Sequence, residues 1–406
     1  MPEGRGRLRV KRTGILLLCM LALTGALYFA GQGLSQSESS LYRQEDKAAG
    51  GTNGKLPEQV LARPDEKLRE EQEDCYAFGK LAEEEQDVYL EILEALVGFR
   101  ENVKLSSCDK EQISRVFQCV LNDHPEIFYV DGYSYTEYTL GSILKKITFT
   151  GSYRFSPEEV EEKQQQIDSY VNQCLADMPE DADEYEKVKY VYEYLIHHTD
   201  YDASAKDSQN ICSVFLERKS VCQGYAKATQ YLLNRAGVFA TLVLGRVVGG
   251  EGHAWNLVRI DGEYYYVDTT WGDASYQAVG GSDYPVEKIP TINYDYLCVT
   301  TEQMELTHTQ DNVVEMPECS SMDANFYVRE GVYFTDFDEE KIEKIFTDSY
   351  DRGDTYVTLK CEGPDTYRKM QETLIGEQEV FRYLDCPDKA VSYVENEKQY
   401  SLSFWL

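Results

Sequence analysis

Residues 220–238 read SVCQGYAKATQYLLNRAGV, and residues 253–270 read HAWNLVRIDGEYYYVDTT. In the first stretch, apolar and small residues recur at steps of three and four and share one helix face: Tyr225, Ala228, Leu232 and Ala236. Gly237 follows where a left-handed residue ends a helix. In the second stretch, the dipeptide Asp261-Gly262 between alternating runs predicts a β-hairpin. The sequence therefore predicts a helix followed by a two-stranded hairpin at the centre of the chain.

Cys222 stands at the predicted start of this helix. The partial positive charge of a helix N-terminus and its amide donors favour a thiolate over a thiol. A thiolate is the nucleophile of cysteine chemistry, and the backbone N–H of Cys222 is a candidate oxyanion donor. Gly224, in the first turn, leaves room for a substrate backbone to approach.

The hairpin register tests two further residues. With a two-residue turn at the Asp-Gly pair, the numbers of facing residues sum to 523, so Trp255 faces Asp268. His253 is then a diagonal neighbour of Asp268 on the same face, with Cβ atoms about 7–8 Å apart. A carboxylate at this distance can orient an imidazole, whereas a slip of one residue would separate the two side chains.

Each of these three residues has an ordinary explanation when it is considered alone. A lone cysteine is more often inert core, a histidine beside a tryptophan is more often packed, and an aspartate at a strand end usually caps or is solvated. The helix start, the hairpin parity and the Cys-His-Asp order agree, and together they favour catalysis by Cys222, His253 and Asp268. We predict no cofactor and no metal, because the five histidines lack ligand spacing.

At these residues the chain resembles the transglutaminase-like superfamily. The resemblance rests on SVCQGYA, GHAWNLV and YYYVDTTWGD, and it extends from about Tyr185 to His308. It implies an α+β fold with a papain-like core, in which Cys222 is the nucleophile, His253 the base and Asp268 the orienting carboxylate. His253 follows Cys222 by 31 residues, whereas papain-type proteases place the histidine about 130–150 residues downstream. The DHPEIFYV segment is similar to a stretch preceding this core in bacterial cell-surface members, and no calcium dependence is expected.

Charge and hydropathy predict where the protein resides. The 406 residues carry 72 acidic and 40 basic side chains, a net charge of −32, which argues against nucleic-acid binding. Five basic residues within positions 1–13 precede an uncharged, apolar stretch at 14–34. This pattern predicts a single membrane span with the body outside the cytoplasm, or alternatively a cleaved signal peptide and a secreted body. We therefore expect protein or peptide substrates at the cell surface, and membrane contact through the N-terminal segment only.

Composition and periodicity divide the chain into six parts. They are a cytoplasmic basic tail (1–13), the apolar segment (14–34), a disordered spacer (35–74), an N-terminal α/β module (75–180), the catalytic domain (181–310) and a small C-terminal α/β domain (320–406). Within the module, the patterns predict helices over 75–100, 110–121 and 157–178, the last capped by Ser156, and strands over 127–130 and 147–155. Beyond Asn293 we expect a linker to about Ser320, and we expect FYVREGVYF (326–334) to be a strand.

The cysteines do not define a disulfide framework. The chain has eleven, without a CxxC pair or a regular spacing. Four lie toward the end of the chain and either form pairs or are buried free thiols: Cys298, Cys319, Cys361 and Cys386. The residues leave three functions open: acyl transfer, peptide or amide hydrolysis by the same triad, and a binding module without catalysis.

Overall fold

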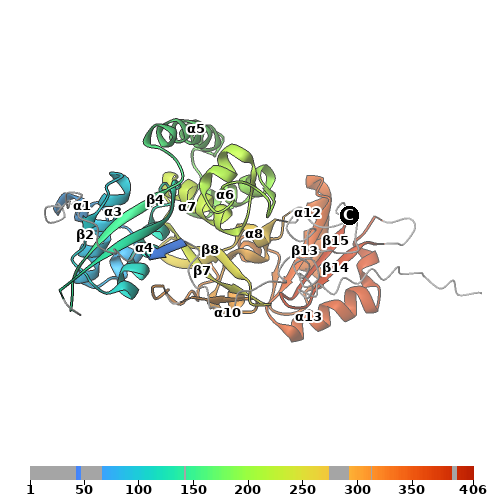
Figure 1. Cartoon of the computed structure of the whole chain (residues 1–406). Coiled ribbons are helices and arrows are strands. Elements are labelled where there is room, and N and C mark those ends of the chain that lie inside the picture. Colours follow the sequence, from blue (N-terminus) through green and yellow to red (C-terminus); the bar gives the residue numbers. More distant parts are fainter. Residues whose placement is uncertain (1–42, 47–65, 141–142, 274–291, 312, 386–390) are drawn as a thin grey trace, which may run out of the picture.

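The computed structural model describes residues 43–46, 66–140, 143–273, 292–311, 313–385 and 391–406, which form an α+β fold as predicted (Figure 1). The N-terminal module, the central sheet and the C-terminal sheet follow one another along the molecule. The predicted membrane segment at 14–34 lies outside the described residues. No helix within the described ranges is long and apolar enough to cross a membrane.

The N-terminal module packs short helices against a four-stranded sheet of order β1-β3-β4-β2. Its helices are α1 (Glu66–Glu70), α2 (Tyr76–Lys80), α3 (Glu83–Val97) and α4 (Lys110–Asp123), and its strands are β1 (Arg43–Asp46), β2 (Val103–Lys104), β3 (Val130–Leu140) and β4 (Ile143–Tyr153). Helix α1 lies within the predicted spacer, so regular structure begins before residue 75. The predicted helix over 75–100 is two helices, because the chain is extended at Leu81 and Ala82.

The DHPEIFYV segment has a structural role in this module. Asp123 is buried and accepts the backbone N–H groups of Ala77 and Phe78, both at 2.9 Å, and the hydroxyl of Tyr89 at 3.0 Å. Its carboxylate therefore caps the start of α2 from the end of α4. The strand predicted over 127–130 starts only at Val130, since the residues before it form a turn that buries their side chains.

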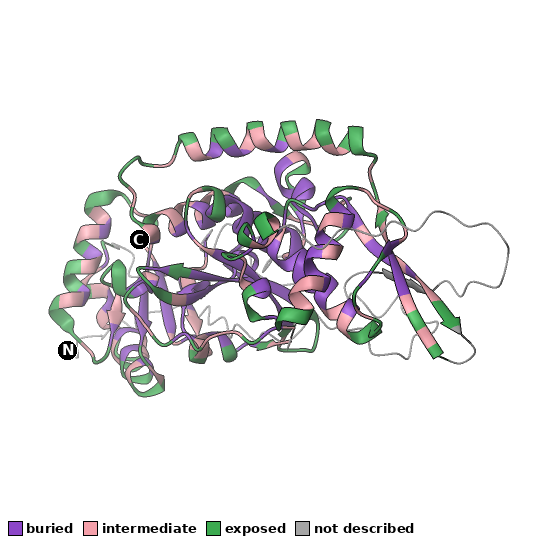
Figure 2. Ribbon diagram, turned by 90° about the vertical axis from the view of Figure 1, so that its left-hand side faces the viewer, coloured by how far each residue is buried: buried purple, intermediate pink, exposed green. Residues whose placement is uncertain are grey.

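Helix α5 (Pro157–Ala176) connects the module to the central domain. As predicted, Ser156 caps it: the Glu159 N–H donates to Ser156 Oγ at 3.3 Å, and the Ser156 N–H donates to Glu159 Oε2 at 2.8 Å. Figure 2 shows that buried residues fill the centre of the molecule, whereas exposed residues lie on the outer sides of the helices.

The central domain is a five-stranded antiparallel sheet of order β10-β9-β8-β7-β11. The strands are β7 (Ala240–Val247), β8 (Gly252–Ile260), β9 (Glu263–Val267), β10 (Leu297–Val299) and β11 (His308–Gln310). The helices are α6 (Glu184–His198), α7 (Cys222–Arg235), α8 (Thr269–Gly272) and α10 (Thr301–Glu305), with the turns η2 (Ser213–Glu217) and η4 (Tyr294–Tyr296) and the short pair β5 (Asp200–Tyr201) and β6 (Lys219–Ser220). Helix α7 packs on the sheet, where Asn256 Nδ2 of β8 donates to Ala226 O at 2.9 Å.

The prediction of a linker beyond Asn293 is wrong. Strands β10 and β11 belong to the central sheet and extend it on both sides, β10 beside β9 and β11 beside β7. Each is three residues long, too short for alternation to show in the sequence. Their partners lie far back in the chain, so only tertiary pairing makes them strands.

The C-terminal domain has its own hydrophobic core and a sheet of order β12-β13-β15-β14. Its elements are α11 (Phe326–Arg329), β12 (Tyr333–Phe334), α12 (Glu339–Arg352), β13 (Tyr356–Cys361), α13 (Pro364–Gln371), η5 (Glu372–Gly376), η6 (Glu379–Arg382), β14 (Tyr393–Asn396) and β15 (Ser401–Trp405). The segment 326–334, predicted as one strand, begins with the helix α11, and only its last two residues form the strand β12. Asn325 starts this helix by accepting the Tyr327 N–H at 3.1 Å.

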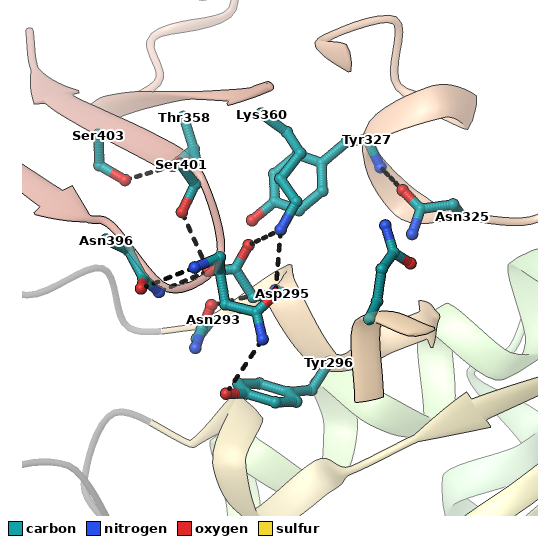
Figure 3. Close-up of polar contacts among 12 residues, drawn as sticks. Asn293, Asp295, Tyr296, Asn325, Tyr327, Thr358, Lys360, Asn396, Ser401 and Ser403 are labelled. Atoms are coloured by element: carbon teal, nitrogen blue, oxygen red, sulfur yellow. Dashed lines mark hydrogen bonds and ion pairs between the residues drawn. The ribbon is translucent and has the colours of Figure 1, made fainter. Parts of the chain in front are cut away.

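A buried ion pair joins the C-terminal domain to the central domain (Figure 3). Lys360 Nζ of β13 lies 2.8 Å from Asp295 Oδ1 of η4, and both residues are only 4% exposed. The second oxygen of Asp295, Oδ2, accepts hydrogen bonds from Ser401 Oγ and Asn396 Nδ2, each at 3.0 Å. The C-terminal domain thus supplies the cation and the donors that a buried carboxylate requires.

The described cysteines are free thiols. The sequence left two possibilities for the cysteines near the end of the chain, disulfide pairs or buried free thiols. Three of them are buried free thiols: Cys298, Cys319 and Cys361. Cys386 lies outside the described residues.

Candidate active site

Cys222 is the first residue of α7, as predicted. It is partly exposed, whereas most of the helix after it is buried. The chain itself requires glycine at position 224: a Cβ there would lie 2.0 Å from Ser220 Oγ and 2.7 Å from Ser208 O. The space at Gly224 is therefore filled by the preceding loop rather than left open for substrate.

The predicted hairpin register is confirmed. Strands β8 and β9 pair from Ile260↔Glu263 to Asn256↔Val267, and every pair sums to 523. Asp261 and Gly262 both have positive φ, at 51° and 88°, as a type I′ turn requires. This local turn sets the register that brings the start of β8 to the end of β9.

His253 and Asp268 meet at that end of the ribbon. His253 Nε2 lies 2.7 Å from Asp268 Oδ2, and the residues are 5% and 0% exposed. Asp268 is also the N-cap of α8, because its Oδ1 accepts the N–H groups of Thr270 and Trp271 at 3.0 and 3.1 Å. The carboxylate is fixed in place on both of its oxygens.

The side chain of Cys222 lies close enough to the imidazole of His253 to raise the pKa of that ring. Since Nε2 faces Asp268, Nδ1 is the nitrogen left for the thiol. Burial by itself would lower the pKa of His253, but the charge of Asp268, its hydrogen bond and the contact with Cys222 raise it to about 10. The positive charge of His253 in turn holds the pKa of Asp268 below its usual range, although burial opposes this. The arrangement favours an imidazolium between a carboxylate and the sulfur.

A second histidine contacts the same carboxylate oxygen, and the sequence did not predict this contact. His308 Nε2 of β11 lies 3.0 Å from Asp268 Oδ2, and its Nδ1 lies 2.8 Å from Thr307 Oγ1. The residue is only 3% exposed. The resemblance ends at His308, but nothing in the sequence indicates that β11 would join the sheet next to β7.

Two tryptophans lie around the histidines. Trp255 and Trp271 have ring centroids 6.0 and 6.2 Å from that of His253, and they are 0% and 7% exposed. Both belong to a buried apolar cluster. They belong to the core and shield the imidazole–carboxylate contact from water.

His253, Asp268 and His308 are also residue types that bind metal ions, with ligand atoms within 4.8 Å of one another. Ligand atoms around a tetrahedral zinc ion lie about 3.3 Å apart, because each is about 2.0 Å from the metal. The contacts to Asp268 Oδ2 measure 2.7 and 3.0 Å. These are the lengths of hydrogen bonds, so the geometry fits a hydrogen-bonded cluster better than a metal site.

Comparison with known proteins identifies this region. Residues 172–269 match the family model described as the Transglutaminase-like superfamily, and this span contains Cys222, His253 and Asp268. Over these residues the chain is similar to transglutaminase-like proteins. It is 31% identical over 123 residues to the kyphoscoliosis peptidase of Mus musculus, and 31% identical over 121 residues to that of Homo sapiens.

These matches cover part of each protein. The aligned segment is 26% of this chain and only 19% and 18% of the mouse and human relatives. A solved structure described as a TGase aligns with 34% of this chain and 50% of its own, at 15% identity and a TM-score of 0.25. The residues matched by the family model, 172–269, hold the candidate site.

Proposed function

We propose that the chain is an exported thiol enzyme that transfers the acyl group of protein or peptide amides. Cys222 is the nucleophile, His253 the general base and acid, and Asp268 the residue that orients the imidazole. The observation that carries the proposal is the continuous contact from thiol to imidazole to carboxylate, of which Cys222 is the most exposed member.

The reaction follows from these contacts. The sulfur of Cys222 attacks the amide carbonyl carbon, and the carbonyl electrons move to oxygen. When the C–N bond breaks, the imidazolium of His253 gives its proton to the leaving amine or ammonia, and a thioester remains on Cys222. An amine or a water molecule then attacks the acyl carbon of the thioester and loses its proton to His253. The C–S bond breaks, which returns the Cys222 thiolate beside the His253 imidazolium. The backbone N–H of Cys222 at the start of α7 is a donor for the oxyanion of each step.

The second step decides between two activities. Attack by a lysine amine gives a cross-link, the outcome that we propose, while attack by water gives hydrolysis. Hydrolysis is the second candidate, because the mouse and human relatives of the core are both named peptidases. A binding module without catalysis would need neither the thiol nor the ordered carboxylate.

We place the body outside the cytoplasm, attached through residues 14–34. Support comes from the charge asymmetry of the sequence, because five basic residues precede that apolar stretch.

One incubation separates the candidates. The purified protein is mixed with a glutamine-containing protein and a labelled primary amine, and the products are analysed by mass spectrometry. We expect the label on glutamine side chains, and we expect no label with Cys222→Ala. Glutamate in place of glutamine, or cleaved peptide bonds, would instead establish the hydrolase. Unchanged substrate with the wild-type protein, or product with Cys222→Ala, would refute the proposed mechanism.

A further inference from the structure

His308 shares a carboxylate oxygen with His253, although it comes from a strand at the opposite edge of the sheet from β10. The centroids of the two imidazole rings lie 5.3 Å apart. Gly245 of β7 permits this approach, since a Cβ there would lie 2.2 Å from Thr309 O and 2.5 Å from the ring of Trp255. The backbone of β11 and the aromatic core thus occupy the space of a missing side chain.

The hydrogen bonds of His308 specify its tautomer. A carboxylate without a proton only accepts, so Nε2 of His308 carries the hydrogen and donates it to Asp268 Oδ2. Nδ1 then has a free lone pair and accepts the hydroxyl of Thr307 at 2.8 Å. Burial and the nearby charge of His253 lower the pKa of His308, and the contacts with Asp268 and the backbone of Met304 only partly offset this. His308 is therefore a neutral donor, in contrast to His253.

Aromatic rings hold His308 in this orientation. The centroids of Trp255, Trp271 and Tyr296 lie 5.0, 4.9 and 5.7 Å from that of the imidazole. With His308 in place, Asp268 accepts four hydrogen bonds, two on each oxygen. A carboxylate has about four lone-pair sites. Its acceptor capacity is therefore filled, and rotation of the group would break at least two bonds.

We propose that His308 is a positioning residue for the triad: its neutral Nε2–H holds Asp268 Oδ2 toward His253 without adding a second positive charge. This inference rests on the proposed function, because it assigns the second contact of the orienting carboxylate. A purely structural histidine would fill the aromatic surroundings equally well without the donor. The donor is the property to test.

Two substitutions separate donor from volume. His308→Phe keeps a ring among the aromatic neighbours and removes the donor, while His308→Gln keeps an N–H near the position of Nε2. For His308→Phe we expect kcat to fall about tenfold or more with KM within about twofold, and the alkaline limb of the pH–rate profile to move to lower pH. For His308→Gln we expect kcat and the limb to return most of the way to wild type. His198→Phe, on the exposed end of α6, is the matched control.

The outcomes distinguish the inference from the proposed function. Wild-type kcat and an unshifted alkaline limb in His308→Phe, or a loss of activity that His308→Gln does not restore, would overturn the role of His308. Product formation by Cys222→Ala, or no product from wild type, would instead overturn the proposed function. If His308→Phe does not fold, Thr307→Val removes the donor to Nδ1 and serves in its place. We then expect a drop in kcat of about threefold and a limb shifted in the same direction, and an unchanged profile would overturn the inference.

Discussion

The substitution Asp268→Asn tests the orienting role with a change of one atom. Oδ1 of Asp268 accepts two backbone N–H groups from the first turn of α8, and Oδ2 faces the Nε2 atoms of His253 and His308. An asparagine amide has only one oxygen. We expect this oxygen to stay with the two backbone donors, which cannot turn away, so that the NH₂ group faces both histidines.

This orientation changes the tautomer of His253. Nε2 must then accept from the asparagine NH₂, and the ring hydrogen moves to Nδ1, the nitrogen that faces Cys222. A protonated Nδ1 on a neutral ring cannot take the proton of the thiol. The base is present but has its hydrogen on the wrong nitrogen.

The structure sets the size of the effect. The productive tautomer needs the amide to flip, which leaves the N–H groups of Thr270 and Trp271 buried without an acceptor. Each such group costs about 1–3 kcal/mol, or about 2–6 kcal/mol for the two. Since each 1.36 kcal/mol is a factor of ten, we expect kcat to fall roughly 30-fold to 10⁴-fold. Asparagine is as good an N-cap as aspartate, so a fall in Tm reports the lost pairing with His253 rather than loss of the cap.

The assay is turnover and Tm of the purified variant beside wild type. Asp109→Asn is the matched control, because Asp109 caps α4 through the N–H groups of Glu111 and Gln112 at 2.9 and 3.1 Å, on the surface of another module. We expect it to keep full activity. Turnover of Asp268→Asn within about threefold of wild type would refute the reasoning, and so would a loss that the unfolded fraction explains.

Three further predictions follow from the domain contact, the ion pair and the N-terminal charge pattern. Lys360→Met leaves the carboxylate of Asp295 buried without its cation, so we expect the free energy of unfolding in a urea titration to fall by about 3–5 kcal/mol. For the exposed control Lys344→Met we expect a fall of less than about 0.5 kcal/mol. Equal urea midpoints for the two variants would contradict this prediction. Because folding raises the pKa of His253 from its ordinary 6.5 to about 10, its pairing with Asp268 stabilises the fold fully below pH 6.5 and is lost as the pH rises through 10. The difference in free energy of unfolding between wild type and Asp268→Asn should therefore shrink between these pH values, and a constant difference would count against the ion pair. Finally, protease added to intact cells should digest the body of the protein, whereas complete protection in sealed cells would exclude the exported orientation.

Interactions between chain neighbours could be predicted from the sequence. The contact of His253 with Asp268 depends on one Asp-Gly turn and on the two-residue period of strands, and both are visible over 18 residues. The start of α7 at Cys222 and the Ser156 cap of α5 are equally local. Such features are set by the chain immediately around them.

Contacts made by short or distant segments could not be predicted. His308 reaches Asp268 through a three-residue strand whose partner, Val247, lies 61 positions earlier. The pair of Lys360 with Asp295 joins two domains and leaves no periodic pattern in either segment. Segment 326–334 has the composition of a strand, but a single Asn325 cap and tertiary packing make its first part a helix.

The alkylation rate of the Cys222 thiol tests directly whether Cys222 is a nucleophile activated by His253. Cys108 is an internal reference, because it is exposed and lies in the N-terminal module. Burial raises the pKa of the seven other described thiols, so they should react slowly: Cys75, Cys119, Cys174, Cys212, Cys298, Cys319 and Cys361. Intact protein is treated with limiting iodoacetamide at neutral pH, and the modified peptides are quantified by mass spectrometry. We predict that Cys222 reacts at least about tenfold faster than Cys108, although it is less exposed, and that His253→Ala removes this advantage. Reaction of Cys222 at or below the rate of Cys108, or a rate unaffected by His253→Ala, would show that His253 does not activate Cys222.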